Sequence, residues 1–322
     1  MMRFIRSSKE EKMKTAKTIL LAIMMLSVFC SYGFAAEKIS DEMQILRITA
    51  ESMKSASVMF TATQVDEIVK KKGADYAIVS LQTPQEFAAG HVPGALRIDF
   101  DLKNIKDSLN KLPKNKKLIL VSSNGQEACK VNLILRQLGF DSGFMMLGMN
   151  AYNRLYAGKG AYAGNVGGEI SMENTNFSPV SNTPAYSGIS GDELVIKSTE
   201  TYAEKNKVFD ITAYDLPAIG DVFLISMQSA EDYAKGHIPG TINIPGADFL
   251  GGDERLLHLP KNRKIVVTCY IGHYSSMGAM MLNQLGYDAY SLQWGAAGWN
   301  LNLAKKIEPL ITKGMNLEIE KQ

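Results

Sequence analysis

Cysteine is scarce in this chain, and its scarcity excludes a scaffold held together by disulfides. Three cysteines occur in 322 residues, whereas small disulfide-built domains carry several paired cysteines within a short chain. Histidine is scarce as well, with four in the sequence. No cluster of Cys, His and carboxylate residues has the spacing of a metal site. We therefore expect neither a metal nor another cofactor.

An excess of charge of one sign is also absent. Lys and Arg number 35 against 33 for Asp and Glu, a formal net charge of +2, which gives no field strong enough to attract nucleic acid. The hydrophobic content of 46% is enough to bury a core in each of two domains of ordinary size. The composition therefore predicts a globular protein without a nucleic-acid partner.

The first 36 residues are typical of a secretory signal peptide rather than of a folded element. Lys14 and Lys17 precede an apolar run at 18–30, and small residues follow at the spacing of a signal-cleavage site. An uncleaved membrane anchor is the alternative, but the run is shorter than the ~20 residues that a span needs. We expect a periplasmic or secreted protein with no stable membrane span after removal of the signal.

The remainder of the chain is a duplication. GHVPGALRI at 90–98 corresponds to GHIPGTINI at 236–244, and LPKNKKLILVSS at 112–123 corresponds to LPKNRKIVVTCY at 259–270. The order and the spacing of the matching segments agree, as a whole-domain duplication requires. The sequence therefore predicts two similar domains in tandem.

The segment between the matching stretches sets the predicted boundaries. Residues 161–190 are rich in Gly, Asn, Ser and Pro and lack apolar periodicity, which is the composition of a linker. We therefore predict domains at 37–160 and 191–322. In each, short β-rich runs alternate with helical patterns, which indicates an α/β fold with a parallel sheet covered by helices. Ligands of such sheets bind beyond the carboxyl ends of the strands.

Cys269 stands at such a strand end. It follows the β-rich run at 264–268, and the pattern predicts a helix that begins at Ser275 and is capped by it. Gly272 permits a tight loop between strand and helix. Backbone N–H groups of the loop and the positive end of the helix dipole would stabilise an anion and lower the pKa of the thiol. Cys269 is therefore the candidate nucleophile, and a buried small hydrophobe is the alternative.

This arrangement resembles the rhodanese superfamily. The resemblance rests on the GHIPG motif, on the strand-ending cysteine with its loop and helix about thirty residues later, and on the closing WGAAGW segment. It implies two tandem three-layer α/β/α domains, each with a parallel sheet of about five strands. It also implies a sulfurtransferase, in which Cys269 takes sulfur from thiosulfate or a similar small anion and holds it as a persulfide for a thiophilic acceptor. The implied substrate-binding residues are Tyr270, Ile271, Gly272, His273, Tyr274 and Ser275.

Two departures from the family pattern leave the donor open. Cationic residues usually occupy the loop of thiosulfate-using members, whereas only His273 can become cationic here. The family's Asp-x-Arg after the first core strand is replaced by Ser226-Met227-Gln228. A different donor such as a mercapto acid is one alternative, and a persulfide carrier or sulfur-binding adaptor without turnover is another.

The first repeat lacks the nucleophile. Ser122 aligns with Cys269, and its loop holds no histidine that could act as a base, so we predict a non-catalytic repeat. Cys129 is expected on a buried helix face, unpaired with Cys269. His91 and His237 lie in the Gly-His-x-Pro-Gly motif of both repeats, and we predict that they fix a turn.

Overall fold

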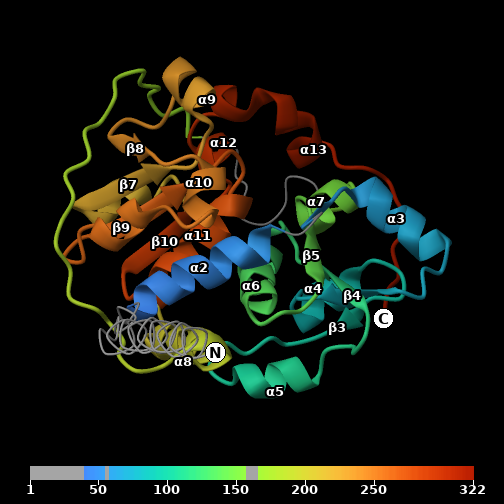
Figure 1. Cartoon of the computed structure of the whole chain (residues 1–322). Helices are drawn as coiled ribbons and strands as arrows, with labels where there is room; N and C mark the ends of the chain where they lie inside the picture. The colour runs from blue at the N-terminus through green and yellow to red at the C-terminus, as the bar shows by residue number, and fades with distance from the viewer. Residues whose placement is uncertain (1–39, 55–57, 157–165) are drawn as a thin grey trace, which may run out of the picture. The chain divides into compact units, whose positions relative to one another are not determined.

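Two parallel five-stranded sheets organise the computed structural model, one in each repeat. The structure describes residues 40–54, 58–156 and 166–322, so the predicted signal peptide lies outside it. The strand orders are β1-β5-β4-β2-β3 and β6-β10-β9-β7-β8, and all strand pairs are parallel (Figure 1). The prediction of two tandem α/β domains with five-stranded parallel sheets is therefore confirmed.

The strands of the two sheets correspond one to one. Those of the first sheet are β1 (Met59–Phe60), β2 (Tyr76–Ser80), β3 (Leu96–Arg97), β4 (Lys117–Val121) and β5 (Ser142–Met145). Those of the second sheet are β6 (Asp210–Ile211), β7 (Val222–Ser226), β8 (Thr241–Asn243), β9 (Lys264–Thr268) and β10 (Asp288–Leu292). The central strands β4 and β9 each have four consecutive buried residues, which is typical of a parallel strand covered on both faces.

Helices cover the sheets of both repeats. Those of the first repeat are α2 (Asp41–Met53), α3 (Ala62–Lys70), α4 (Pro84–Ala89), α5 (Ile105–Asn110), α6 (Gln126–Gln137) and α7 (Gly148–Tyr152). Those of the second are α8 (Gly191–Glu204), η1 (Leu216–Ile219), α9 (Ala230–Lys235), α10 (Gly246–Leu250), η2 (Glu254–His258), α11 (His273–Gln284), α12 (Gly295–Trp299), η3 (Leu301–Ile307) and α13 (Glu308–Thr312). Helices α6 and α11 follow the central strands and are therefore equivalent.

The repeated Gly-His-x-Pro-Gly motif forms a turn in each repeat. Gly94 has a φ of 72°, the left-handed conformation that a Pro-Gly turn requires. The Nδ1 atom of His91 lies 2.7 Å from the carbonyl oxygen of Phe87, and the two rings stack. His237 makes the same two contacts with Tyr233. The prediction that both histidines fix a turn is confirmed.

Helices α6 and α11 pack against each other and join the repeats through one hydrophobic core. The equivalent residues Gln137 and Gln284 exchange two hydrogen bonds of 2.9 and 2.8 Å in this interface. Each amide also donates to a threonine of the helix that precedes the sheet of its own repeat. Gln137 donates to Thr49 of α2, and Gln284 donates to Thr199 of α8. Buried amides whose protons are all used specify one pairing of the helices, because any other pairing would leave these groups without partners.

Residues 166–190, which follow the first repeat and are here called its tail, lie on the second repeat. Ser171 forms an antiparallel bridge with His237. The side-chain amide of Asn300 donates a hydrogen bond of 2.7 Å to the carbonyl of Gly168. Further along, the side chain of Asn182 donates to backbone carbonyls of the η2 region. Residues 166–190, part of the predicted linker, are therefore bound along the second repeat, where Figure 1 shows them passing around its sheet.

The C-terminal segment of the described chain, here called the tail of the second repeat, lies on the first repeat. Glu320 forms an antiparallel bridge with His91, and Figure 1 shows the C-terminus beside β3 and β4. The side-chain amide of Asn153, the residue equivalent to Asn300, donates a hydrogen bond of 2.6 Å to the carbonyl of Leu317. The two repeats therefore exchange their tails through matching contacts.

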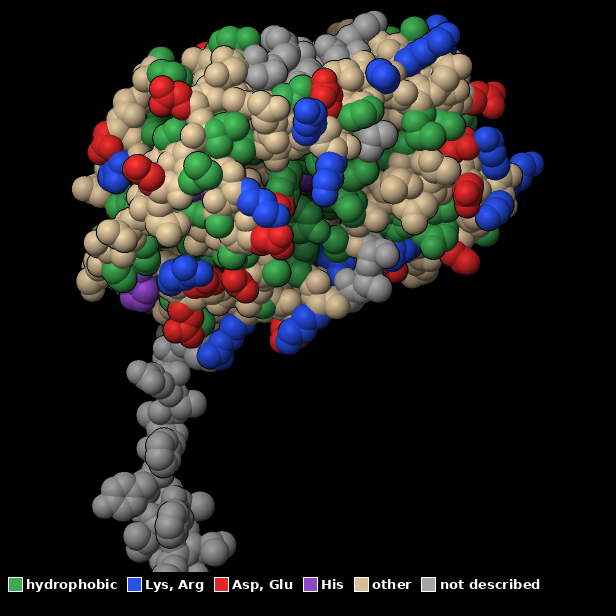
Figure 2. Space-filling view, turned by 90° about the horizontal axis from the view of Figure 1, so that it is seen from above, with side chains coloured by type: hydrophobic (Ala, Val, Ile, Leu, Met, Phe, Trp, Pro, Cys, Tyr) green, Lys and Arg blue, Asp and Glu red, His purple; other side chains and the backbone are tan. Residues whose placement is uncertain are grey.

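Charges of both signs are mixed on the face of the molecule in Figure 2. Lys and Arg side chains lie next to Asp and Glu side chains there, around a hollow lined by hydrophobic groups. This face therefore offers no continuous cationic surface for a polyanion. Of the helices formed by the described residues, none has the length and apolar character needed to cross a bilayer.

Replacing Asn153 or Asn300 by Ala should detach one tail in each case. The lost donor leaves a tail carbonyl without its partner, so the free energy of unfolding should fall by about 1–3 kcal/mol. Urea unfolding measures this loss, and limited proteolysis with mass spectrometry locates the released segment. We expect cleavage within 315–320 in Asn153→Ala and within 166–173 in Asn300→Ala. Cleavage of the same tail in both variants would contradict the exchange.

Candidate functional site

Cys269 lies at the carboxyl end of β9, the central strand of the second sheet. This is the position in the fold that the sequence predicts for it. The residue is 3% exposed. The edge of a parallel sheet at its carboxyl ends is where ligands of α/β proteins bind, so the thiol is placed at the ligand side of the domain.

The loop after Cys269 is shorter than predicted. Helix α11 begins at His273, and Gly272 is its N-cap with a φ of 89°. A glycine in this left-handed conformation turns the chain into the helix at once. The predicted helix start and cap at Ser275 are therefore wrong. Ser275 lies within the first turn, and its hydroxyl lies 3.1 Å from that of Ser291.

The turn that begins at Trp294 and continues into α12 holds this loop from behind. Ala296 and Ala297 donate their N–H groups to the carbonyls of Cys269 and Tyr270, at 2.7 and 3.0 Å. Gly295 permits this approach, because a Cβ there would collide with the carbonyl oxygen of Cys269. A trans peptide points its N–H opposite to its C=O. The N–H groups of Tyr270 and Ile271 therefore point away from the turn.

The first repeat shows what a loop of this kind can hold. Ser122 occupies the position of Cys269, and its hydroxyl accepts hydrogen bonds from the N–H groups of Gly125 (3.1 Å) and Ala128 (3.2 Å). Gly272 and Ser275 are the equivalent residues in the second repeat. Donors aimed at this position would stabilise a thiolate, which is the nucleophilic form of cysteine.

The side chains of the predicted substrate-binding residues point in several directions. The hydroxyl of Tyr270 donates to the carboxylate of Asp232 (2.5 Å), and this bond lowers the pKa of Asp232. Ile271 is buried in a hydrophobic cluster. Tyr274 packs half-buried against the core, and burial raises its pKa. These side chains supply no cation, so an anion at Cys269 would depend on the loop backbone.

His273 faces the first repeat. Its Nε2 atom lies 3.3 Å from the backbone nitrogen of Leu147 and 3.2 Å from the carbonyl oxygen of Asn124. The residue is 1% exposed, and burial lowers its pKa to about 4. The ring is therefore neutral at pH 7, and His273, the one loop side chain that can become cationic, gives the loop no charge at that pH.

Gln126 is the equivalent of His273 and makes the reciprocal contact. Its Oε1 atom accepts a hydrogen bond of 3.0 Å from the N–H of Trp294, in the turn behind the Cys269 loop. Gln126 is 1% exposed. Sequence reasoning missed this residue, although its alignment with His273 at the start of the equivalent helix was the available signal.

Asp210, at the start of β6, is a second residue that sequence reasoning missed. Its side chain lies 3.4 Å from the Nε2 atom of Gln126. Burial raises the pKa of this carboxyl to about 7, with Glu127 raising it further and Lys130 opposing the shift. The site therefore contains a carboxyl group that titrates near neutrality and that no local motif reveals.

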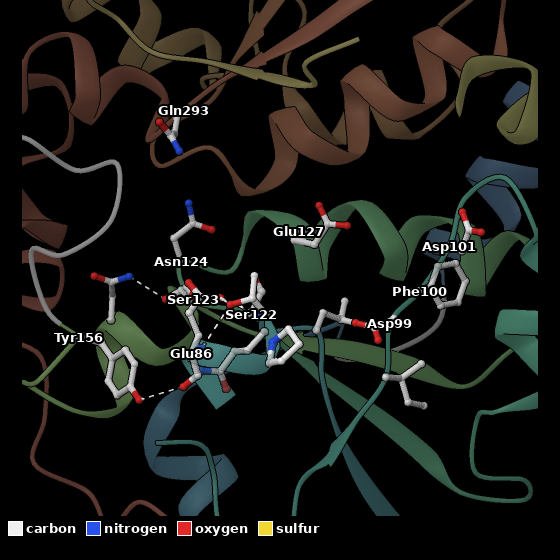
Figure 3. A pocket seen from close by; sticks show the side chains of 16 residues that line it. Glu86, Asp99, Phe100, Asp101, Ser122, Ser123, Asn124, Glu127, Tyr156 and Gln293 are labelled. Atoms are coloured by element: carbon white, nitrogen blue, oxygen red, sulfur yellow. Dashed lines mark hydrogen bonds between the residues drawn. The ribbon is translucent and has the colours of Figure 1, made fainter. Parts of the chain in front are cut away.

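A cavity of about 600 Å³ opens beside Ser122 in the first repeat (Figure 3). Glu86, Asp99, Asp101 and Glu127 line it, and no Lys, Arg or His is among its lining residues. Hydrogen bonds from neighbouring groups lower the pKa of Asp99 and of Asp101, so both remain ionised at pH 7. Asp99 pairs with Arg97 and Glu127 with Lys130, so part of this negative charge is neutralised, and the lining itself offers an anion no cation.

A second cavity of about 420 Å³ lies beside Tyr270 in the second repeat. Lys235, Lys305 and Lys306 line it, together with the carboxylate of Asp232. Tyr270 stands where the first repeat has a serine, and Asp232 where it has Glu86. The two cavities thus occupy related places in the repeats and carry opposite excess charge.

The two cysteines of the described chain are free thiols, as predicted. Cys129 is fully buried on α6, and burial raises its pKa well above the ordinary value. A thiol of this kind is not ionised at neutral pH and is a poor nucleophile. Within the described residues, no group of three or more His, Cys, Asp or Glu side chains is placed to hold a metal ion.

Two segments of the chain, 61–155 and 212–302, match the family model described as a rhodanese-like domain. Together they cover more than half of the chain and fall on the two sheets. A tRNA sulfurtransferase of Desulfurococcus amylolyticus is 33% identical over 86 residues, which are 27% of this chain and 16% of that protein. A putative sulfur carrier protein of Bacillus subtilis, YrkF, is 30% identical over 64 residues, 20% of this chain and 33% of that protein.

Each of these matches spans a minor part of the relative's own length. Among solved structures, the thiosulfate sulfurtransferase of Pseudomonas aeruginosa is 16% identical, with a TM-score of 0.30, over 80% of this chain and 49% of that one. The family is therefore given by the matched domains, and these relatives do not define the activity of the whole protein.

Protonation of His273 should destabilise the folded protein. Its pKa is about 4 when folded and about 6.5 when unfolded, so the unfolded state binds the proton more readily between these values. The contribution to stability is full above about pH 6.5 and is lost as the pH falls to about 4, by roughly 3 kcal/mol at most. His273→Gln should remove this part of the pH dependence.

Urea unfolding of both proteins at about pH 7 and about pH 4.5 measures the effect. Asp210 titrates in the same range with the opposite sign, because its raised pKa makes stability fall as the pH rises from about 4 to about 7. It is present in both proteins, so the difference between them isolates His273. An identical pH dependence in the two proteins would refute the assignment.

Proposed function

Because the chain belongs to the family of proteins built from rhodanese-like domains, we propose that it is a sulfurtransferase that carries sulfur on Cys269 as a persulfide. The observation that carries the proposal is the place of Cys269 in the fold. It follows the central strand of its sheet and precedes a left-handed glycine and a helix N-terminus. The counterpart of this loop directs two N–H groups at Ser122.

The proposed reaction consists of two substitutions at sulfur. The thiolate of Cys269 attacks the outer sulfur of a donor such as thiosulfate. A new S–S bond forms while that of the donor breaks, and sulfite leaves with the bonding electron pair. A thiophilic acceptor, either a small molecule or a protein thiol, then attacks the outer sulfur of the persulfide and releases the thiolate. The cycle consumes no external oxidant or reductant.

A small sulfur-containing anion is the donor class that the surroundings favour. The cavity beside Tyr270 has three lysines against one carboxylate, an excess of positive charge. These lysines would attract an anion to the side of the domain that holds Cys269, a role that the loop side chains cannot fill. Thiosulfate is the simplest donor of this class.

The names of the related proteins support a role in sulfur transfer. One is a tRNA sulfurtransferase and another a putative sulfur carrier protein. This chain has 35 basic and 33 acidic residues, and the near balance argues against a nucleic acid as its substrate. Of the activities that these names describe, the site supports the transfer of sulfur between small molecules or thiols.

A persulfide carrier without turnover is the second candidate, and the burial of Cys269 favours it. At 3% exposure, a persulfide on this residue would be shielded from solvent until a partner reached it. A turnover enzyme must instead admit a small acceptor to the same sulfur. The two candidates share the persulfide and differ in how fast it is discharged.

We place this activity in the periplasm or outside the cell. The support is the signal-peptide pattern of the first 36 residues, which lie outside the described structure. Both thiols of the described chain are buried. Burial would protect them from unwanted oxidation in such a compartment, because exposed thiolates are the reactive ones.

Cys269→Ser should abolish sulfur transfer, because an alcohol cannot form a persulfide. Release of thiocyanate from thiosulfate and cyanide measures turnover, and intact-protein mass spectrometry detects the persulfide. Cys129→Ala is the matched control and should retain both signals. Absence of turnover and of persulfide in the wild-type protein would refute the proposal, whereas a stable persulfide with negligible turnover would establish the carrier.

Tyr270→Ser should open the path to Cys269. The change reproduces the first repeat, where Ser123 donates to Glu86 at 2.6 Å and the cavity reaches Ser122. We expect alkylation of Cys269 by iodoacetamide to become severalfold faster, because access limits the reactivity of a buried thiol. Tyr270→Phe is the control, since it removes the bond to Asp232 and keeps the ring. Equal alkylation rates in Tyr270→Ser and the wild type would contradict a blocking role.

A further inference from the structure

Gln126 belongs to the repeat without a catalytic cysteine, yet its side chain enters the loop region of the repeat that has one. It is the first residue of α6, directly after the left-handed Gly125. This position aims the side chain across the interface between α6 and α11. A Cβ added at Gly272 would lie 2.6 Å from the side-chain carbon Cδ of Gln126. The amide is therefore in close contact with the Cys269 loop.

Both ends of this amide are engaged. Oε1 accepts the N–H of Trp294 at 3.0 Å. Nε2 lies 3.4 Å from the hydroxyl of Ser276, and that hydroxyl donates to the carbonyl of Gly272 at 2.7 Å. Gln126 thus contacts the Cys269 loop from two sides, through the turn behind it and through the first turn of α11.

The contact with Trp294 helps to fix the backbone at Cys269. Trp294 has a φ of 60°, an unusual conformation for a residue other than glycine. The turn that it begins holds the carbonyls of Cys269 and Tyr270. Fixing those carbonyls fixes the direction of the next two N–H groups, because each peptide unit is planar. An acceptor for the Trp294 N–H therefore helps to keep the loop donors in place.

The first repeat has a comparable contact, made by a different side chain. His273 enters from the second repeat, and its Nε2 atom lies 3.3 Å from the N–H nitrogen of Leu147, the equivalent of Trp294. The turn that follows Leu147 holds the carbonyl of Ser122 through Met149. Either a glutamine or a histidine can therefore occupy this place in the fold.

We propose that Gln126 is a positioning residue for the Cys269 loop, and that this contact is what the cysteine-free repeat contributes to the reaction. The inference rests on the proposed function of Cys269. In this arrangement the catalytic repeat is incomplete by itself, because the acceptor that orders its loop comes from the other repeat. Gln126 acts through the backbone and does not touch the transferred sulfur.

Three variants of the full chain test the proposal. Gln126→Leu keeps the approximate volume and removes the acceptor. Gln126→His reproduces the contact that His273 makes in the first repeat and is the conservative rescue. Gln137→Leu is the matched control, since it removes another buried amide from the same helix and interface at the end far from the loop.

The readouts are the rate of Cys269 alkylation by iodoacetamide as a function of pH, kcat and KM for thiosulfate, and the thermal midpoint. For Gln126→Leu we expect roughly tenfold slower alkylation near neutral pH, with an apparent thiol pKa about one unit higher. Its kcat should fall and its KM change less. Gln137→Leu should lower the thermal midpoint without moving the thiol pKa, and Gln126→His should stay close to the wild type.

The proposal is overturned if folded Gln126→Leu keeps the wild-type pH profile, or if Gln137→Leu shifts that profile as much. Peptide mass spectrometry of the alkylated protein assigns the reaction to Cys269 rather than to Cys129. The alkylation profile does not require turnover. A wild-type protein that forms no persulfide would thus refute the proposed function, while the effect of Gln126 on the thiol would still be measured.

Discussion

The packing of α6 against α11 is the contact on which the rest of the structure depends. Each helix starts at the loop of its own repeat, so pairing the two helices brings both loops to one interface. The first residues, Gln126 and His273, then enter the opposite loops, while Gln137 and Gln284 bind each other near the last turns. A shift of one helix along the other would leave these buried groups without partners, which is costly in a low-dielectric interior. The exchanged tails reinforce the same pairing from outside, because each repeat binds the tail of the other.

The two repeats share one fold but differ in the chemistry of their loops and cavities. The loop of the first repeat holds a hydroxyl, and its cavity is lined by four carboxylates and by no Lys, Arg or His. The loop of the second repeat holds a thiol, and three lysines line the cavity beside it. The aromatic ring of Tyr270 takes the place of Ser123. Cys269 and Ser122 are buried to nearly the same extent, at 3% and 4% exposure, and Ser122 lines the cavity of its repeat. Cys269 and Ser122 thus occupy the same position in the fold, and the side chains around that position differ.

The sequence was sufficient for the fold and for the position of Cys269. Alternating strand and helix signals gave both sheets, and the alignment of the repeats placed Ser122 and Cys269 after equivalent central strands. It failed where the determining contact crosses between repeats. His273 was expected among the substrate-binding residues of its own loop, as the one side chain there that can become cationic. It instead lies buried against Asn124 and Leu147 of the other repeat and is neutral at pH 7. The early start of α11 was missed because a left-handed Gly272 replaces the expected cap at Ser275. No local signal reports that residues 166–190, with their linker composition, bind along the second repeat.

Gln126 and His273, the two residues that contact the loop of the opposite repeat, differ in how their side chains respond to pH. The acceptor that holds the turn behind Cys269 is an amide oxygen, which does not titrate at any physiological pH. The group in the corresponding place behind Ser122 is an imidazole, whose Nε2 atom can accept the Leu147 N–H in one neutral tautomer and cannot accept it once protonated. Asp210 contacts the other end of the Gln126 amide and has a pKa of about 7, but a carboxyl oxygen accepts a hydrogen bond in either protonation state. The backbone around Cys269 is thus held by a contact that survives changes of pH, and the titratable contact lies at the loop of Ser122.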